Sequence, residues 1–123
     1  WHGEKREMAG VIAADVVMHE KPVGRGYVRL ASTTAHPWLP PDSHPDEIPA
    51  HEFHYSSLEN LDPATRFAYE VKRGHGADGA HDGIVHKNLL ASYTHLRSAG
   101  NCNWAARFAG FARQRKLLPT PTP

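Results

Sequence analysis

The sequence contains very little cysteine, with Cys102 as its one thiol. A single thiol cannot form an intramolecular disulfide, which excludes a disulfide-stapled scaffold and fits a reducing compartment. No apolar run approaches the roughly 20 residues that span a bilayer, and the first residues lack the pattern of a signal peptide. We therefore expect a cytoplasmic protein without a membrane-spanning segment.

An excess of charge of one sign is also missing, since the formal net charge is +1. Lys and Arg are scattered, whereas proteins that follow a nucleic acid backbone gather them in a stripe. Neither nucleic acid nor membrane is therefore expected as a partner. With 123 residues, 40% of them apolar and 22% charged, the chain has the size and composition of one globular domain.

The two ends of the sequence suggest a piece of a longer domain. There is no initiator Met, and Trp1 leads within a few residues into an apolar run. We expect residues 1–117 to be the C-terminal portion of a domain whose earlier elements precede Trp1. The final residues alternate Thr and Pro, so 118–123 are expected to form a disordered tail.

The chain is expected to be rich in strands and to end in one helix. Short runs of β-branched and aromatic residues, bounded by Gly, Pro and Asn, predict extended segments. They lie at residues 8–18, 27–30, 51–56, 66–73, 82–87 and 89–96. We expect the first segment to be a buried strand and a turn at Gly24 and Gly26 to precede the second. We expect the third and fourth segments to form an antiparallel pair.

Three further segments complete this outline. Prolines between residues 32 and 49 predict a long surface loop, either a functional cover or a tolerated insertion. Glycines between residues 74 and 83 predict a flexible connection. Asn101 or Asn103 is expected to cap the last helix. Its aromatic residues recur at helical spacing and are expected to face the core: Trp104, Phe108 and Phe111.

Ten histidines raise the question of a metal site. His51, Glu52 and His54 are close in sequence, but in a strand His51 points to one face and the other two to the opposite face. Only two ligands would converge, and neither an HExxH helix motif nor a Cys pair is present. We expect no metal site, although a small histidine-dependent metalloprotein remains an alternative.

Two other features give weak signals. The glycine-rich segment 74–83 lacks the Gly-Lys-Ser/Thr that ends a phosphate-binding loop, so a nucleotide cradle is not expected. Cys102 lies at the start of the last helix, where a thiolate is stabilised by the helix dipole, yet such a lone residue is more often structural. His95 lies at the C-terminal end of a predicted central strand, the edge where open α/β sheets place their active sites. Taken alone, it is more often a hydrogen-bonded residue at a strand end.

Four blocks, in this order and spacing, carry a more specific signal. They are GYVRL at residues 26–30, HEFHYS at 51–56, DG at 82–83 and NLLASYTHL at 88–96. Together they resemble the glutamine amidotransferase domain of cobyrinic acid a,c-diamide synthases. The resemblance implies an α/β, flavodoxin-like class I amidotransferase domain that hydrolyses glutamine with a cysteine and a histidine. It gives the role of catalytic base to His95.

The resemblance also places the other parts of the site. The nucleophile is expected in a Cys-Gly-Gly turn shortly before residues 8–11, outside this chain, so the chain alone is expected to be inactive. Cys102 follows His95 and has no Gly-Gly beside it, so it does not take the role. Glu52, His54 and Tyr93 are expected near the active site. Two residues depart from the family pattern: Ala50 stands in place of Gly, and Arg97 in place of a second His.

By this resemblance, the parent protein is an ATP- and glutamine-dependent ligase that amidates the a and c carboxylates of cobyrinic acid in cobalamin biosynthesis. ATP would activate each carboxylate and Mg²⁺ would accompany the nucleotide, both in an upstream domain, so this chain is expected to bind no cofactor. Its partners would be glutamine and, through that domain, the tetrapyrrole. Two alternatives remain open: amidation of sirohydrochlorin or sirohaem derivatives, and a non-catalytic binding or scaffold module derived from an amidotransferase.

Overall fold

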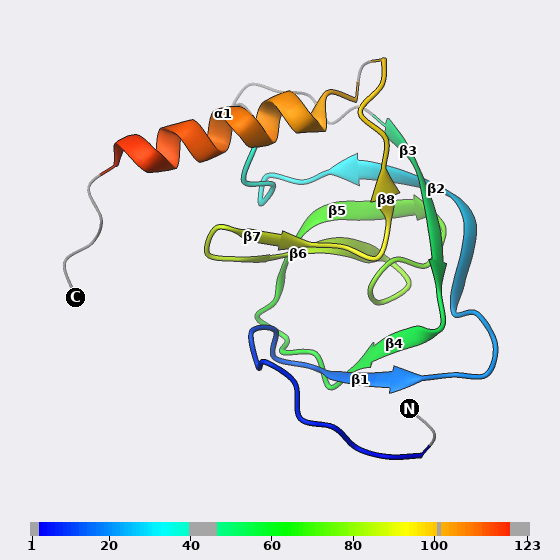
Figure 1. Ribbon diagram of the computed structural model, residues 1–123. Helices are drawn as coiled ribbons and strands as arrows, with labels where there is room; N and C mark the ends of the chain where they lie inside the picture. The colour runs from blue at the N-terminus through cyan, green and yellow to red at the C-terminus, as the bar shows by residue number, and fades with distance from the viewer. Residues whose placement is uncertain (1–2, 40–46, 101, 119–123) are drawn as a thin grey trace.

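The computed structural model describes residues 3–39, 47–100 and 102–118. In chain order its elements are β1 (Asp15–Met18), β2 (Gly24–Ser32), β3 (Glu47–His54), β4 (Ser56–Glu59), β5 (Arg66–Arg73), β6 (His81–His86), β7 (Leu89–Ala91), β8 (His95–Leu96) and α1 (Trp104–Leu117) (Figure 1). β1 and β4 form a two-stranded sheet, and the other strands form a six-stranded sheet in the order β7-β6-β5-β2-β3-β8. All pairs among these described strands are antiparallel.

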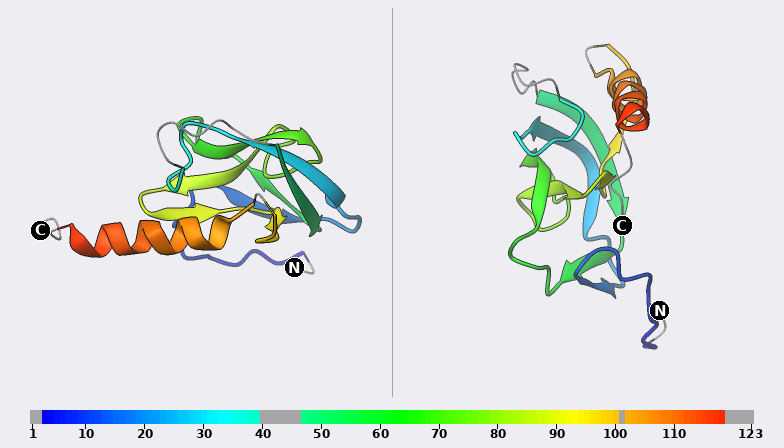
Figure 2. Two further views of the ribbon diagram at one scale, coloured as in Figure 1. Left: turned by 90° about the horizontal axis from the view of Figure 1, so that it is seen from above. Right: turned by 90° about the vertical axis from the view of Figure 1, so that its left-hand side faces the viewer.

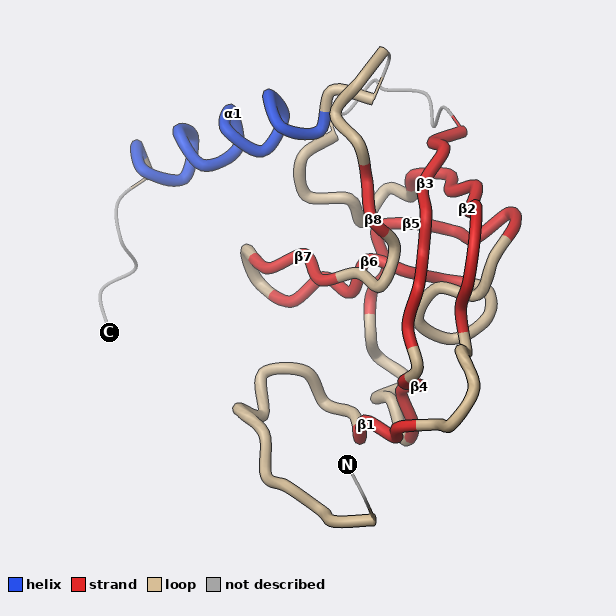
Figure 3. Tube along the Cα trace, turned by 45° about the vertical axis from the view of Figure 1, so that its right-hand side comes forward, coloured by secondary structure: helices blue, strands red, loops and turns tan. Residues whose placement is uncertain are grey.

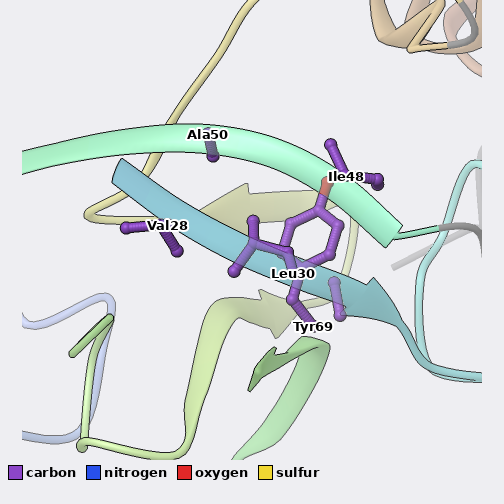
Figure 4. Packing of buried hydrophobic residues seen from close by; sticks show 6 residues of the cluster. Val28, Leu30, Ile48, Ala50 and Tyr69 are labelled. Atoms are coloured by element: carbon purple, nitrogen blue, oxygen red, sulfur yellow. The ribbon is translucent and has the colours of Figure 1, made fainter. Parts of the chain in front are cut away.

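The middle of the large sheet is built on β2. Buried residues alternate with exposed ones along both β2 and β3, as expected for a sheet with one covered face. β2 pairs with β3 along one edge, from Gly24 to Ala31, and with β5 along the other, from Arg29 to Ser32. The buried side chains of these central strands form the core: Val28, Leu30, Ile48, Ala50, Ala68 and Tyr69 (Figure 4).

The large sheet curls so that its two edge strands approach each other. β7 ends at Ala91 and β8 begins at His95, so a link of three residues joins opposite edges of the sheet. Because an extended chain spans at most ~3.3–3.6 Å per residue, the edges lie close together (Figure 3). The curl encloses the core on its inner side and leaves the other face of β2, β3 and β8 outside.

The structure confirms the predicted strand-rich chain with a C-terminal helix. It corrects the first predicted strand, residues 8–18. Only residues 15–18 of that run pair, because their partner β4 is itself four residues long. Val16, Val17 and Met18 are exposed rather than buried.

The predicted turn at Gly24 and Gly26 is also wrong, because both residues lie inside β2. Gly24 pairs with His54, and a Cβ there would lie 2.5 Å from the Glu52 Oε2 atom. Glycine is thus needed for close approach of side chains from β3. Gly26 has φ +112, a conformation that L side chains rarely adopt.

The predicted loop 32–49 is shorter than expected. β2 continues through Ser32 and β3 begins at Glu47, so Pro49 lies in a strand, opposite Arg29. Residues 33–39 are irregular, and 40–46 lie outside the described residues. The predicted glycine-rich connection holds for residues 74–80, since β6 starts at His81.

The predicted pair between residues 51–56 and 66–73 does not form. β2 lies between β3 and β5 and pairs with both, since its nine residues offer one edge to each. The segment 51–56 also divides, because β3 ends at His54 and β4 begins at Ser56 and pairs with β1 instead.

The predicted strand 89–96 divides as well. The chain bends at residues 92–94, after which β8 pairs with β3 at the far edge of the sheet. His95 therefore begins a short edge strand, whereas a position at the end of a central strand was expected.

The C-terminal helix forms where predicted but is not part of the core. None of its residues is buried, and Phe108 is 47% exposed. Its aromatic side chains contact Trp38, whose ring centroid lies 5.0 Å from that of Phe108. Asn103 occupies the N-cap position without a side-chain hydrogen bond, and Asn101 lies outside the described residues. The helix extends beyond the sheet (Figure 2), which explains the exposure of its face.

The predicted tail lies mostly beyond the described structure. The helix ends at Leu117, Leu118 is an exposed residue with extended backbone, and 119–123 lie outside the described residues.

Candidate active site

His95 lies on the outer face of the curled sheet. In the ladder between β8 and β3 it is directly opposite His51, and the two ring centroids are 6.4 Å apart in an edge-to-face arrangement. His51 is in turn opposite Tyr27 of β2, with ring centroids 6.1 Å apart. All three residues are exposed. The imidazole of His95 is thus open to an incoming group and has a second imidazole beside it.

Glu52 and His54 lie on the opposite, inner face of β3 and are buried. The alternation that the sequence predicted for HEFHYS is therefore confirmed. It separates these two residues from His95, because the strand itself lies between the two faces. The structure brings Glu52 and His54 together but does not place them beside the predicted base.

The Glu52 carboxylate is surrounded by hydrogen-bond donors. It accepts bonds from the backbone N–H of His75 at 2.7 Å and of Gly76 at 2.9 Å, and contacts His54 Nε2 at 3.0 Å. Burial raises the pKa of this carboxyl group, but the hydrogen bonds from His75, Gly76 and His54 outweigh burial and place the pKa below its usual value. Glu52 is therefore ionised at neutral pH and anchors the loop after β5.

Both ring nitrogens of His54 face acceptors. Nε2 contacts the Glu52 carboxylate, and Nδ1 lies 2.9 Å from the backbone carbonyl of Ser56. A neutral imidazole carries one N–H and can donate to only one of them, whereas an imidazolium donates to both. The contact between His54 and Glu52 is a buried ion pair whenever the imidazole carries both protons.

Tyr93 joins this inner cluster. Its ring stacks on the His54 ring, with centroids 4.0 Å apart and an interplanar angle of 21°. Its hydroxyl group lies 2.8 Å from Ser56 Oγ. The three residues predicted near the active site, Glu52, His54 and Tyr93, therefore gather in one polar cluster. Tyr93 lies two positions before His95 in the chain and is half-buried.

The sequence reasoning missed two members of this region. Asp82 is fully buried and accepts hydrogen bonds from the backbone N–H of Tyr93 at 3.1 Å and of Thr94 at 2.9 Å. His51 was considered only as a metal ligand, although it faces His95. The sequence feature that could have indicated a role for Asp82 is the DG block, where an acidic residue lies inside a predicted strand.

Neither Cys102 nor a metal cluster belongs to this site as described. Cys102 is half-buried, packs against the core cluster and forms an isolated bridge with Ala99. Within residues 3–39, 47–100 and 102–118, no group of three or more His, Cys, Asp or Glu residues converges in a way that could hold a metal ion. In the same part of the chain, no helix has the length and apolar character needed to cross a membrane.

The sequence matches a family of amidotransferase domains. The model of the CobB/CobQ-like glutamine amidotransferase domain matches residues 2–101, a range that holds His95, His51 and the inner polar cluster. The chain therefore belongs to this family. The match ends before α1, the element that projects from the sheet.

Curated relatives share one name. A cobyrinate a,c-diamide synthase of Magnetococcus marinus is 45% identical over 98% of this chain and 25% of its own length. Proteins of the same name from Halobacterium salinarum and Archaeoglobus fulgidus are 39% and 34% identical, over 76% and 89% of this chain and 20% and 23% of their own lengths. The chain thus spans a quarter or less of these relatives. No solved structure matches it.

Proposed function

We propose that this chain is the part of a cobyrinate a,c-diamide synthase that supplies the glutaminase base, His95. The observation that carries the proposal is the family match over residues 2–101 together with the 45% identity to a synthase of that name. The exposed position of the His95 ring supports it, because a base must reach a thiol and a substrate amide. The parent would be a ligase that amidates the a and c carboxylates of cobyrinic acid.

The chemistry assigned to His95 is proton transfer in two directions. Imidazole gains and loses a proton near neutral pH, so it can take the proton of a cysteine thiol. The thiolate attacks the glutamine amide carbon, and the same imidazole then protonates the departing ammonia as the C–N bond breaks. A glutamyl thioester remains, and water cleaves it to glutamate and regenerates the thiol. We expect the nucleophile in a part of the parent protein other than this chain.

ATP and Mg²⁺ have a different place in the proposal. ATP would activate each carboxylate as an acyl phosphate with release of ADP, and ammonia would then attack the acyl carbon and displace phosphate to form the amide. Mg²⁺ prefers several oxygen ligands, and the described residues contain no cluster of acidic side chains that fits it. No step of the glutaminase chemistry is therefore assigned to the metal or the nucleotide in this chain.

Replacing His95 in the full-length protein tests the proposal. His95→Ala should abolish amidation with glutamine as nitrogen donor and leave amidation with added ammonia unchanged, because ammonia bypasses the base. His86→Ala, at an exposed histidine that ends β6, is the matched control and should behave as the wild type. Glutamine-dependent activity that survives in His95→Ala would contradict the proposal, and so would loss of both activities in a folded protein.

The same experiment separates the alternatives. A scaffold module would show no glutamine hydrolysis in the wild-type parent. A sirohydrochlorin or sirohaem amidating enzyme would show the same dependence on His95, but with a different tetrapyrrole as the substrate that is consumed.

A further inference from the structure

The strand that carries His95 is too short to fix its own position. β8 has two residues, and its ladder with β3 consists of the pairs Ala50↔Leu96 and His51↔His95. A ladder of this length contributes few backbone hydrogen bonds. The placement of His95 opposite His51 therefore depends on the bend at residues 92–94, through which the chain enters β8.

Asp82 holds the backbone of that bend. Its side chain has 0% exposure, and each carboxylate oxygen accepts a different backbone N–H: Oδ1 that of Tyr93 at 3.1 Å and Oδ2 that of Thr94 at 2.9 Å. A buried carboxylate is unfavourable unless it is hydrogen-bonded, and bonds to an ionised acceptor are stronger than neutral ones. One side chain thus sets the direction of the chain just before His95.

Asp82 itself is firmly placed. It lies in β6, opposite Tyr69 of the central part of the sheet. The next residue, Gly83, has φ +70 and packs so closely on the Tyr69 ring that an added Cβ would lie 2.7 Å from it. The carboxylate therefore projects toward residues 93 and 94 from a strand of the sheet, and not from a loop that could follow the bend.

We propose that Asp82 is a positioning residue for His95. The inference rests on the proposed function of His95 as glutaminase base. Asp82 contacts neither glutamine nor the thiol; it acts through the backbone of Tyr93 and Thr94. Loss of either hydrogen bond should let β8 shift, so that the imidazole no longer meets the thiol at the distance and angle that proton transfer needs.

Asp82→Asn in the full-length protein tests the inference. The amide has the same shape, but its NH₂ group would face a backbone N–H, so one of the two bonds is lost and a donor is left unpaired. We expect kcat for glutamine hydrolysis to fall by about 100-fold, the effect of a small misplacement of a catalytic group. The KM for glutamine and the rate of ammonia-dependent amidation should stay at wild-type values.

Asp78→Asn is the matched control. The Asp78 carboxylate also accepts two backbone N–H bonds, from Ala80 at 2.9 Å and His81 at 2.6 Å, but it holds the connection before β6. The Asp78→Asn variant should therefore keep the wild-type kcat for glutamine hydrolysis. Asp82→Ser, whose hydroxyl oxygen can accept a bond, is a second and smaller variant and should also lower kcat without changing KM.

The outcomes separate the inference from the proposed function. Wild-type kcat in Asp82→Asn beside an inactive His95→Ala overturns the inference alone, whereas glutamine hydrolysis in His95→Ala overturns the proposed function. If both Asp82 variants lose glutamine binding, Asp82 serves folding rather than placement, and the inference fails. An equal loss of kcat in Asp78→Asn would also overturn it, because the effect would not be specific to the bend.

Discussion

At the scale of single residues, the inner cluster is held by the carboxylate of Glu52. Glu52 is 2% exposed and receives hydrogen bonds from the backbone of His75 and Gly76 and from the His54 ring. In Glu52→Gln, the side-chain NH₂ group would face the backbone N–H of His75 or Gly76, and a buried donor would lose its acceptor. We expect this substitution to lower the free energy of unfolding by about 1–3 kcal/mol, the usual cost of a buried donor left without an acceptor.

Urea unfolding at pH 7 measures this loss. The control is Glu59→Gln, because Glu59 is exposed and accepts a hydrogen bond from Ser57 Oγ on the surface. It should change the free energy of unfolding little. Equal losses in the two variants would show that the buried Glu52 carboxylate does not hold the inner cluster together.

His36 is expected to make the stability of the protein depend on pH. Burial, with a further contribution from the nearby Arg107 cation, lowers the pKa of His36 from 6.5 to about 4. Its Nδ1 atom accepts the backbone N–H of Trp38 at 3.1 Å, and its Nε2 atom lies 2.9 Å from the Tyr69 hydroxyl. A neutral ring satisfies this arrangement, since Nδ1 must remain without a proton to accept.

Protonation of His36 should lower the stability of the folded protein in acid. The unfolded chain binds a proton at His36 below about pH 6.5, whereas the folded chain binds it only near pH 4, so stability falls as pH falls through this window. The difference corresponds to about 3 kcal/mol. His36→Gln should therefore lose less stability than the wild type between pH 7 and pH 4, as measured by urea unfolding at each pH. An identical pH dependence in the two proteins would contradict a buried neutral His36.

At the scale of elements, β2 and β3 approach closely at Gly24. A Cβ at this position would meet the His54 ring and the Glu52 carboxylate from the neighbouring strand. Gly24→Ala should therefore displace the inner cluster and destabilise the protein by about 1–3 kcal/mol, as overpacking does. Thermal unfolding measures the change.

Gly110→Ala is the control for this substitution. Gly110 lies in α1, and an added Cβ meets no atom within 4 Å. Alanine favours a helix over glycine by roughly 1 kcal/mol, so this variant should be as stable as the wild type or more stable. A Gly24→Ala protein with wild-type stability would show that the two strands do not pack as closely as described.

Local patterns predicted the strands but not their neighbours. Residues 27–30, 66–73 and 82–87 alternate or carry β-branched side chains, and each falls mainly in a strand. The pairing could not be predicted, because β2 separates two strands whose sequences suit each other equally well. Gly24 resembles a turn residue, and the reason for it, the side chains of Glu52 and His54, lies in another strand.

The helix shows the same limit. Its aromatic spacing correctly predicted one face, but burial depends on which surface that face meets. In this fold it meets the ring of Trp38, at Phe108 and Phe111, and it stays partly exposed. Periodicity shows which side chains share one face of a helix, but it does not show which part of the fold that face contacts.

At the scale of the whole molecule, curling of the six-stranded sheet produces two chemically different faces. The inner face holds the apolar core and, next to it, the polar cluster of Glu52, His54 and Asp82. The outer face carries His95, with His51 and Tyr27 in register beside it. Sequence resemblance led to His95, and alternation along HEFHYS predicted which side chains share a face. The contact between the two sheet edges was not predictable, because it depends on the curl.

If His95 is the glutaminase base, as proposed, a buried cluster supports an exposed catalytic group. The inner residues fix the bend at 92–94, and the bend delivers His95 to the outer face, where a thiol and an amide can reach it. In the proposed function, His95 generates the thiolate and Asp82 holds the bend that places it.

The most direct measurement is the rate at which a chloroketone analogue of glutamine alkylates the nucleophilic thiol of the full-length protein, followed by mass spectrometry at saturating analogue. If His95 takes the thiol proton, His95→Gln should slow alkylation by about 10²–10⁴-fold at pH 7, and His86→Gln should alkylate at the wild-type rate. Alkylation of His95→Gln at the wild-type rate would contradict the account, because the thiolate would then form without this histidine.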